Sequence, residues 1–181
     1  KKNSVNKINV AVVGLGLVGL QRLKALLFLR KIAKKTSLII SAYDPDKNKL
    51  KDIKNLKNVK FFSKFSDLLF KKNDLVIICT PHNVTKKLSL IFLKKGSNLL
   101  VEKPFGISSK EAKQLVSFRK KRQKIHVGFN YRFFKSINLL INDIRLNKFG
   151  KIISVNLISG HGHSPSMKRS WKLNPRIIST K

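Results

Sequence analysis

Short runs of consecutive apolar residues alternate along the chain with longer segments in which apolar residues recur every three or four positions. The short runs predict six strands, over 8–13, 38–43, 59–62, 75–79, 98–101 and 125–129. The longer segments predict five helices, over about 18–34, 46–56, 66–71, 83–95 and 108–122. Strands that are apolar on both faces are typical of a parallel sheet covered by helices on both sides. The alternation therefore predicts an α/β fold with a doubly wound parallel sheet.

Local signals support two of the predicted helix boundaries. Ser108 followed three residues later by Glu111 predicts a capping box at the start of the fifth helix. Gly96, directly after Lys94 and Lys95, predicts the end of the fourth.

The pattern changes after residue 132. A helix-like stretch over 133–146 leads into residues 151–159, which predict a strand, and Gly160 to Pro165 then interrupt regular structure. We therefore predict that residues 1–132 form one domain, built on the doubly wound sheet. Residues 133–181 are expected to form the incomplete start of a second domain.

The net charge raises the question of a polyanionic partner. The 181 residues include 40 Lys and Arg but 8 Asp and Glu, for a formal charge of +32. Only 8 of the basic residues are Arg, the side chain best suited to phosphates and base edges, and the Lys pairs are spread along the chain. Asn and Ile are abundant too, which indicates compositional bias. We expect no specific nucleic-acid partner, and keep nucleic-acid binding as an alternative.

The sequence also argues against disulfide-bonded, metal-binding and membrane-spanning proteins. A single cysteine, Cys79, excludes a disulfide framework and multi-cysteine zinc sites, and its apolar neighbours predict a buried thiol. His161 and His163 have no acidic or cysteine companion nearby, so no metal site is expected. No apolar run approaches the roughly 18 residues that span a bilayer. We expect a cytoplasmic protein without a membrane partner.

A GxGxxG pattern follows the first predicted strand and opens the first predicted helix, the context that a dinucleotide-binding loop requires. Its residues are Gly14, Leu15, Gly16, Leu17, Val18 and Gly19. Gly14 allows a tight turn, Gly16 lets the backbone approach a pyrophosphate, and Gly19 allows close packing of helix on strand. The helix N-terminus would supply N–H groups to the phosphates. The alternative is a chance glycine cluster in a turn.

Asp44 stands at the end of the second predicted strand, where a carboxylate can accept hydrogen bonds from the adenosine ribose. It would repel a 2′-phosphate, which favours NAD as the cofactor. Lys47 lies close enough in sequence that NADP is not excluded. Asp44 can also serve as a helix N-cap before Pro45.

Three further segments follow predicted strands at the edge where ligands bind in such folds. They are Cys79-Thr80-Pro81-His82-Asn83, Glu102-Lys103-Pro104 and Gly128-Phe129-Asn130-Tyr131-Arg132. Together with the glycine loop, they resemble the glucose-fructose oxidoreductase / inositol dehydrogenase (Gfo/Idh/MocA) family, from Ile8 to Trp171. Glu-Lys-Pro after a strand is the most specific element of the resemblance.

The resemblance implies an NAD(P)-dependent oxidoreductase that acts on sugars, sugar derivatives or polyols. It also implies that residues 1–132 are the NAD-binding Rossmann domain and that residues 133–181 begin an α+β substrate domain. Lys103 would be the catalytic residue, helping proton transfer at the substrate hydroxyl or polarising its oxygen; the alternative is an ordinary exposed lysine. Glu102 would contact the nicotinamide ribose, and Pro104 would shape the backbone beneath the cofactor. The resemblance places three more residues along the cofactor's path: Thr80, Pro81 and Asn83.

Four residues are candidates for substrate contacts: Tyr131, Arg132, His163 and Trp171. Tyr131 and Arg132 suit a domain hinge equally well, and Trp171 suits packing. Family members commonly pair through their substrate domain, so a homo-oligomer is possible for the full-length protein.

The sequence departs from the family pattern in two ways. Thr85 stands where members commonly carry a His. The usual glycine-rich segment followed by an Asp and a His is also missing before Lys181. We therefore expect a fragment without the full active site, and the alternative function is a dinucleotide-binding regulatory module without turnover.

Overall fold

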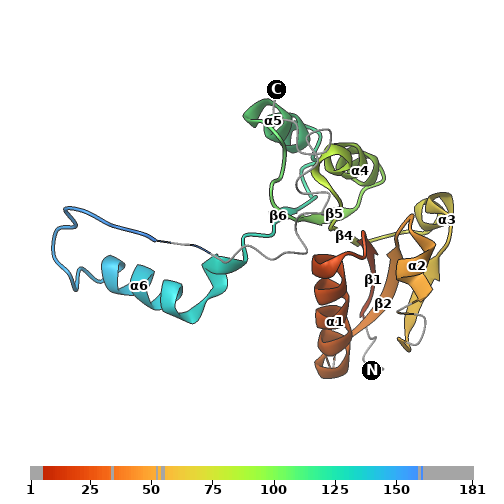
Figure 1. Ribbon diagram of the computed structural model, residues 1–181, viewed down its shortest axis with the longest axis horizontal. Helices are drawn as coiled ribbons and strands as arrows, with labels where there is room; N and C mark the ends of the chain where they lie inside the picture. The colour runs from red at the N-terminus through yellow and green to blue at the C-terminus, as the bar shows by residue number, and fades with distance from the viewer. Residues whose placement is uncertain (1–5, 34, 52, 54–55, 159, 161–181) are drawn as a thin grey trace.

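A six-stranded parallel sheet forms the centre of the protein, in the order β3-β2-β1-β4-β5-β6 (Figure 1). The computed structural model describes residues 6–33, 35–51, 53, 56–158 and 160. The strands are β1 (Asn6–Val13), β2 (Thr36–Tyr43), β3 (Val59–Phe62), β4 (Leu75–Ile78), β5 (Asn98–Val101) and β6 (Ile125–Val127). The helices are α1 (Leu17–Ile32), α2 (Lys47–Lys51), α3 (Phe65–Phe70), α4 (His82–Lys94), α5 (Ser109–Ser117), the 3-10 helix η1 (Asn130–Phe133) and α6 (Lys135–Arg145). The predicted doubly wound fold is confirmed.

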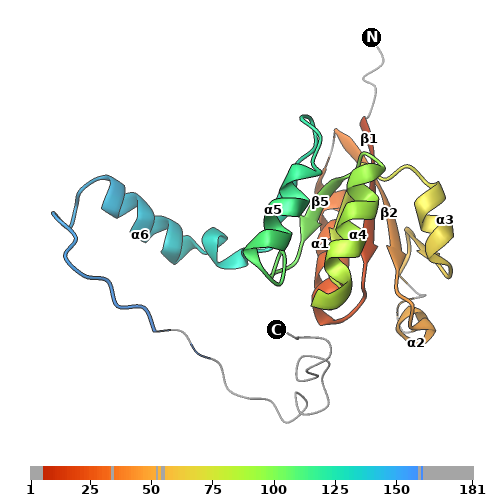
Figure 2. The same cartoon turned by 90° about the horizontal axis from the view of Figure 1, so that it is seen from above.

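Both faces of the sheet are buried, which explains why its strands are continuous apolar runs. Because side chains alternate along a strand, Val10 and Val12 of β1 pack on the α1 side, while Ala11 and Val13 pack on the side of α3 and α4. Figure 2 shows α4 and α5 in front of the sheet, with α1 behind it.

The strand order creates the crevice that holds the site. The chain leaves β1 towards one edge strand and later returns to place β4 on the other side of β1. At this switch point the loops after β1 and β4 diverge to opposite faces of the sheet, which opens a ligand crevice at their carboxyl ends.

Both predicted boundary signals are confirmed. Ser108 Oγ accepts a hydrogen bond from the Glu111 backbone N–H at 3.2 Å, and Glu111 Oε2 accepts one from the Ile107 N–H at 3.1 Å. Gly96 adopts a left-handed φ of +89° just after α4. The predicted end of the fifth helix at residue 122 is wrong, because α5 ends at Ser117.

The predicted strand over 151–159 is also wrong for residues 151–158, which form no regular secondary structure. This segment and α6 extend away from the sheet (Figures 1 and 2), and the Ile158 side chain is 98% exposed. A strand needs a neighbour for its backbone hydrogen bonds, and no described strand pairs with this segment. Within the described residues, no helix is long and apolar enough to cross a membrane.

Candidate functional site

The glycine loop packs so closely that two of its glycines cannot carry a side chain. Gly14 has a φ of +90°, and a Cβ there would lie 2.6 Å from the carbonyl oxygen of Cys79. A Cβ on Gly19 would lie 1.9 Å from the Gly14 oxygen. These contacts bring the start of α1 directly against the ends of β1 and β4, as the motif predicts.

Gly16 differs from the other two, because a Cβ there would meet nothing within 4 Å. It is the N-cap of the 16-residue helix α1, and a glycine offers no side-chain oxygen to the N–H groups of the first turn. No acidic residue lies in that turn. The helix N-terminus therefore presents N–H groups and a positive partial charge to open space, an arrangement that suits a phosphate. Leu17 and Val18 in this turn are exposed, whereas Leu15 is buried in the core.

Asp44 connects the end of β2 to the glycine loop. Its side chain is 4% exposed. Oδ2 accepts a hydrogen bond from the Leu15 backbone N–H at 2.7 Å, and Oδ1 accepts one from the Asp46 N–H at 2.9 Å. Lys49 Nζ lies 3.5 Å from Oδ2. The N-cap alternative falls to Asp46, whose side chain accepts from the Asn48 N–H in the first turn of α2.

A groove of about 500 Å³ runs along the carboxyl ends of β1, β2 and β4. Its lining includes five of the predicted cofactor-binding residues: Gly14, Gly16, Asp44, Thr80 and Pro81. The structure thus brings together residues that lie up to 67 positions apart in the sequence. The volume falls in the range of small-molecule sites.

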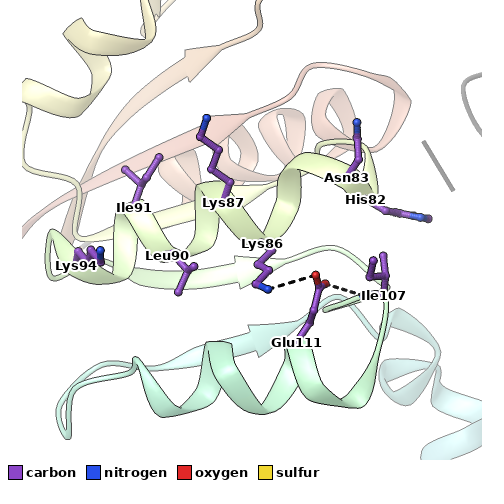
Figure 3. Close-up of a pocket in the computed structure, with 9 residues that line it drawn as sticks. All are labelled: His82, Asn83, Lys86, Lys87, Leu90, Ile91, Lys94, Ile107 and Glu111. Carbon is purple, nitrogen blue, oxygen red and sulfur yellow. Dashed lines mark hydrogen bonds and ion pairs between the residues drawn. The ribbon is translucent and has the colours of Figure 1, made fainter. Parts of the chain in front are cut away.

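Asn83 lies beside this groove rather than in it. It lines a second pocket of about 420 Å³ between α4 and α5, together with Lys86 and Glu111, whose charged groups are 3.4 Å apart (Figure 3). Lys87 lines both pockets. Asn83 thus lies at the start of α4, where the second pocket adjoins the groove.

Thr85 occupies the position at which the resemblance leads one to expect His. It is buried, and its hydroxyl donates to the Pro81 carbonyl oxygen at 3.1 Å. The side chain therefore holds the turn that leads from β4 into α4, and does not line the groove described above.

Glu102, Lys103 and Pro104 follow β5, the strand next to β4. The Glu102 backbone N–H donates to the Ile78 carbonyl oxygen at 2.9 Å, which continues the pairing with β4. Lys103 and Pro104 are exposed, and the peptide bond between them is cis. The lysine thus projects from the carboxyl edge of the sheet that also carries the glycine loop.

Arg22 of α1 is a site residue that the sequence reasoning missed. Its Nε donates to Glu102 Oε1 at 2.8 Å, and its Nη2 donates to the same oxygen and to Asn130 Oδ1, the latter at 2.7 Å. Helical periodicity alone shows only that Arg22 lies among the polar positions of the first helix, and the rarity of Arg in a Lys-rich chain is the signal that could have singled it out.

Cys79 is half-buried at the end of β4 and lines the groove. Burial raises the pKa of its thiol to about 12, with a further upward contribution from the Glu102 charge and an opposing one from Arg22. The thiol is therefore protonated at neutral pH and is not a nucleophile.

Tyr131 and Arg132 lie in η1 and are exposed. Arg132 lines a pocket of about 560 Å³ with Gly128, Asn130 and Arg22. The structure therefore places Arg132 beside β6, and β6 and the Asp44-bearing strand β2 lie on opposite sides of β1 and β4 in the sheet. Among the other candidates, His161, His163 and Trp171 lie outside the described residues.

Comparison with known proteins gives one family match. The model of a family described as "Oxidoreductase family, NAD-binding Rossmann fold" (Gfo/Idh/MocA) matches residues 8–131. A curated relative, glucose-6-phosphate 3-dehydrogenase from Bacillus subtilis, is 27% identical over 122 residues, which are 67% of this chain and 35% of the relative.

Solved structures resemble the chain over most of its length. Myo-inositol 2-dehydrogenase from Lactobacillus plantarum is 25% identical with a TM-score of 0.70, and the match covers 82% of this chain and 44% of that one. The WlbA dehydrogenase from Bordetella pertussis, solved in complex with NADH and UDP-GlcNAcA, is 20% identical with a TM-score of 0.70, covering 81% and 43%. The chain spans less than half the length of each of these three proteins.

Proposed function

Because this chain belongs to the Gfo/Idh/MocA oxidoreductase family, with its NAD-binding Rossmann fold, we propose that it acts as an NAD(P)-dependent oxidoreductase on sugars, sugar derivatives or polyols. The proposal rests on one observation: Lys103 lies at the same edge of the sheet as the glycine loop. Helix α1 begins in this loop directly after Gly16, with free space in front of it and no side-chain cap. The named relatives support the substrate class, since they include dehydrogenases of a sugar phosphate and of an inositol.

The residues around the groove fit a dinucleotide. Gly16 leaves room for a pyrophosphate against the N-terminus of α1, and Asp44 stands where the adenosine ribose would lie. Thr80 and Pro81 line the groove between these points and the end of β5. A bound nicotinamide would supply the hydride donor or acceptor.

The Asp44 carboxylate favours NAD. A 2′-phosphate would bring a second negative charge to a buried carboxylate, which already holds two backbone N–H groups and so cannot move away without breaking those bonds. Lys49, 3.5 Å from Oδ2, offsets part of this repulsion. We therefore propose a preference for NAD that is moderate in size.

Lys103 is the proposed catalytic residue. Its exposed ammonium at the end of β5 can hydrogen-bond to a substrate hydroxyl, polarise that oxygen and exchange a proton with it. Glu102 and Pro104 would border the nicotinamide side of the site. Tyr131 and Arg132, on η1, would contact the substrate beside the end of β6. His163 and Trp171 stay candidates for substrate contacts from the sequence alone.

Titration of the purified chain with NADH, followed by cofactor fluorescence and thermal shift, tests the binding part of this proposal. We expect a saturable response that ADP competes with, because both ligands carry the phosphates that the glycine loop would hold. No response to NADH would refute the proposal.

Turnover separates the oxidoreductase from the alternative, a dinucleotide-binding module without activity. A set of sugar phosphates and inositols would be tested with NAD and the cofactor reduction recorded. Activity that Lys103→Ala abolishes, with NADH binding retained, supports the enzyme. NADH binding without turnover of any tested substrate supports the module.

A further inference from the structure

One guanidinium group joins three segments that are far apart in the sequence. Arg22 projects from the second turn of α1 to Glu102 after β5, 80 positions away, and to Asn130 at the start of η1, 108 positions away. The side chains of Arg22 and Glu102 are 24% and 12% exposed, so most of this ion pair is shielded from water. Shielded, multiply hydrogen-bonded pairs hold a fixed geometry far better than surface pairs do.

The Glu102 carboxylate is also held from its other side. A Cβ on Gly128 would lie 2.6 Å from Oε2, so the absence of a side chain at Gly128 lets the carboxylate pack against the backbone that follows β6. The Gly128 N–H donates to the Val101 carbonyl oxygen at 2.8 Å, which fixes this backbone relative to β5. Glu102 is thus enclosed between Arg22 and Gly128, with little freedom to rotate.

The next residue along the chain is the exposed Lys103. A long exposed side chain has many rotamers, and its useful direction depends on the backbone from which it starts. That backbone is anchored by the Glu102 side chain on α1 and β6, and by the Glu102 N–H on β4.

We infer that Arg22 is a positioning residue for the nicotinamide end of the site: it fixes the Glu102 carboxylate and, through it, the backbone that carries Lys103. The inference rests on the proposed function. Arg22 also ties Asn130, and with it the start of η1, to the same carboxylate. The network therefore sets the distance between the cofactor side and the substrate side of the site. The adenosine end, formed by Asp44 and the glycine loop, takes no part in it.

This separation of the two ends gives the test. NADH spans both ends, whereas ADP reaches only the adenosine and phosphate end. Affinities of the full chain for NADH and for ADP would be measured for the wild type, Arg22→Gln, Arg22→Lys and the control Arg30→Gln. Arg30 lies on the same helix, but it is bonded to Asn58 at the far end from the site.

We expect Arg22→Gln to weaken NADH binding about tenfold, because Glu102 would then lose its charge-assisted hydrogen bond to the nicotinamide ribose. ADP binding should stay within about twofold of the wild type. Arg22→Lys should restore part of the loss, because it keeps the charge without the planar fork. The emission maximum of bound NADH should shift in Arg22→Gln, because the nicotinamide surroundings change. Arg30→Gln should match the wild type in all readouts.

Each of the other possible results contradicts the proposed function or the positioning role of Arg22. If the wild type does not bind NADH, the proposed function is wrong, and the inference falls with it. If the wild type binds NADH but Arg22→Gln keeps the wild-type ratio of NADH to ADP affinity, the positioning role is wrong while the proposed function stands. An equal loss of both affinities would show a general structural role and also refute the inference. If Arg22→Gln does not fold, Asn130→Ala, at an exposed position, must lower the same ratio by about twofold, and an unchanged ratio refutes the inference.

Discussion

Gly16 and Gly19 lie three residues apart in one motif, yet the structure gives them separable roles. Substitution of Gly19 by Ala places a Cβ 1.9 Å from the Gly14 oxygen, and since that oxygen belongs to the backbone, the loop has to move. Overpacking of this kind costs about 3 kcal/mol. For a chain of this length the melting temperature should fall by roughly 6–12 °C.

Gly16→Ala should show the opposite pattern. Its Cβ meets nothing within 4 Å, so the fold loses only the small N-cap preference of Gly over Ala, about 1 kcal/mol or less. The methyl group would, however, occupy the space through which a pyrophosphate approaches the N-terminus of α1. Loss of one charge-assisted hydrogen bond there weakens NADH binding by about 10- to 100-fold.

Thermal melts and NADH titrations of both variants measure the two effects. Gly160→Ala serves as the matched control, because it makes the same chemical change at another open position. A Gly16→Ala variant that binds NADH like the wild type would refute the assignment of the phosphate site. A Gly19→Ala variant with the wild-type melting temperature would refute the packing argument.

Three further results are expected. Asp44→Asn should raise the affinity for NADPH relative to NADH, because the repelling charge at the end of β2 is gone; an unchanged ratio in a direct titration would contradict the ribose assignment. Folding raises the pKa of the Cys79 thiol from 9.0 to about 12, so the free energy of unfolding should fall as the pH rises between these values. Chemical denaturation should show a smaller fall in Cys79→Ala. Ser108→Ala should cost about 1 kcal/mol in the same assay, because the N-terminus of α5 loses its cap. Ser66→Ala should cost less, because the Ser66 hydroxyl donates to its exposed neighbour Asp67 and caps no helix.

Much of the sheet could be predicted from the sequence, because a strand buried on both faces has to be apolar at nearly every position. The six predicted strands fall within two residues of those observed, and β3 and β5 coincide with their predictions. The glycine loop was equally accessible, because a GxGxxG spacing between an apolar strand and an amphipathic helix can be recognised within a short stretch of sequence. The backbone against which Gly14 packs, that of Cys79, is known only from the structure.

The errors arise where long-range contacts decide the structure. The fifth helix ends early, and the loop after it is held by Gln123, whose side-chain amide donates to the carbonyl oxygens of Leu93 and Ser97. The strand predicted over 151–159 has the right residue types, but it has no described neighbour to pair with. Arg22 was missed for a related reason. Helical periodicity shows on which face of a helix a residue lies, but it does not show that the Arg22 guanidinium bonds to a carboxylate 80 positions away.

The few acidic residues of the chain say more about its ligand than the net charge of +32 does. A cationic surface attracts phosphates of every kind, so the lysines alone cannot distinguish a dinucleotide from any other polyanion. Two of the eight acidic residues, Asp44 and Glu102, lie at the ends of β2 and β5, and each is shielded and fixed by hydrogen bonds from α1 or the loop before it. Such fixed carboxylates can accept bonds from sugar hydroxyls and repel misplaced phosphates. We therefore expect selectivity at this site to depend on the carboxylates, and the lysines to contribute mainly to the rate at which an anionic ligand arrives.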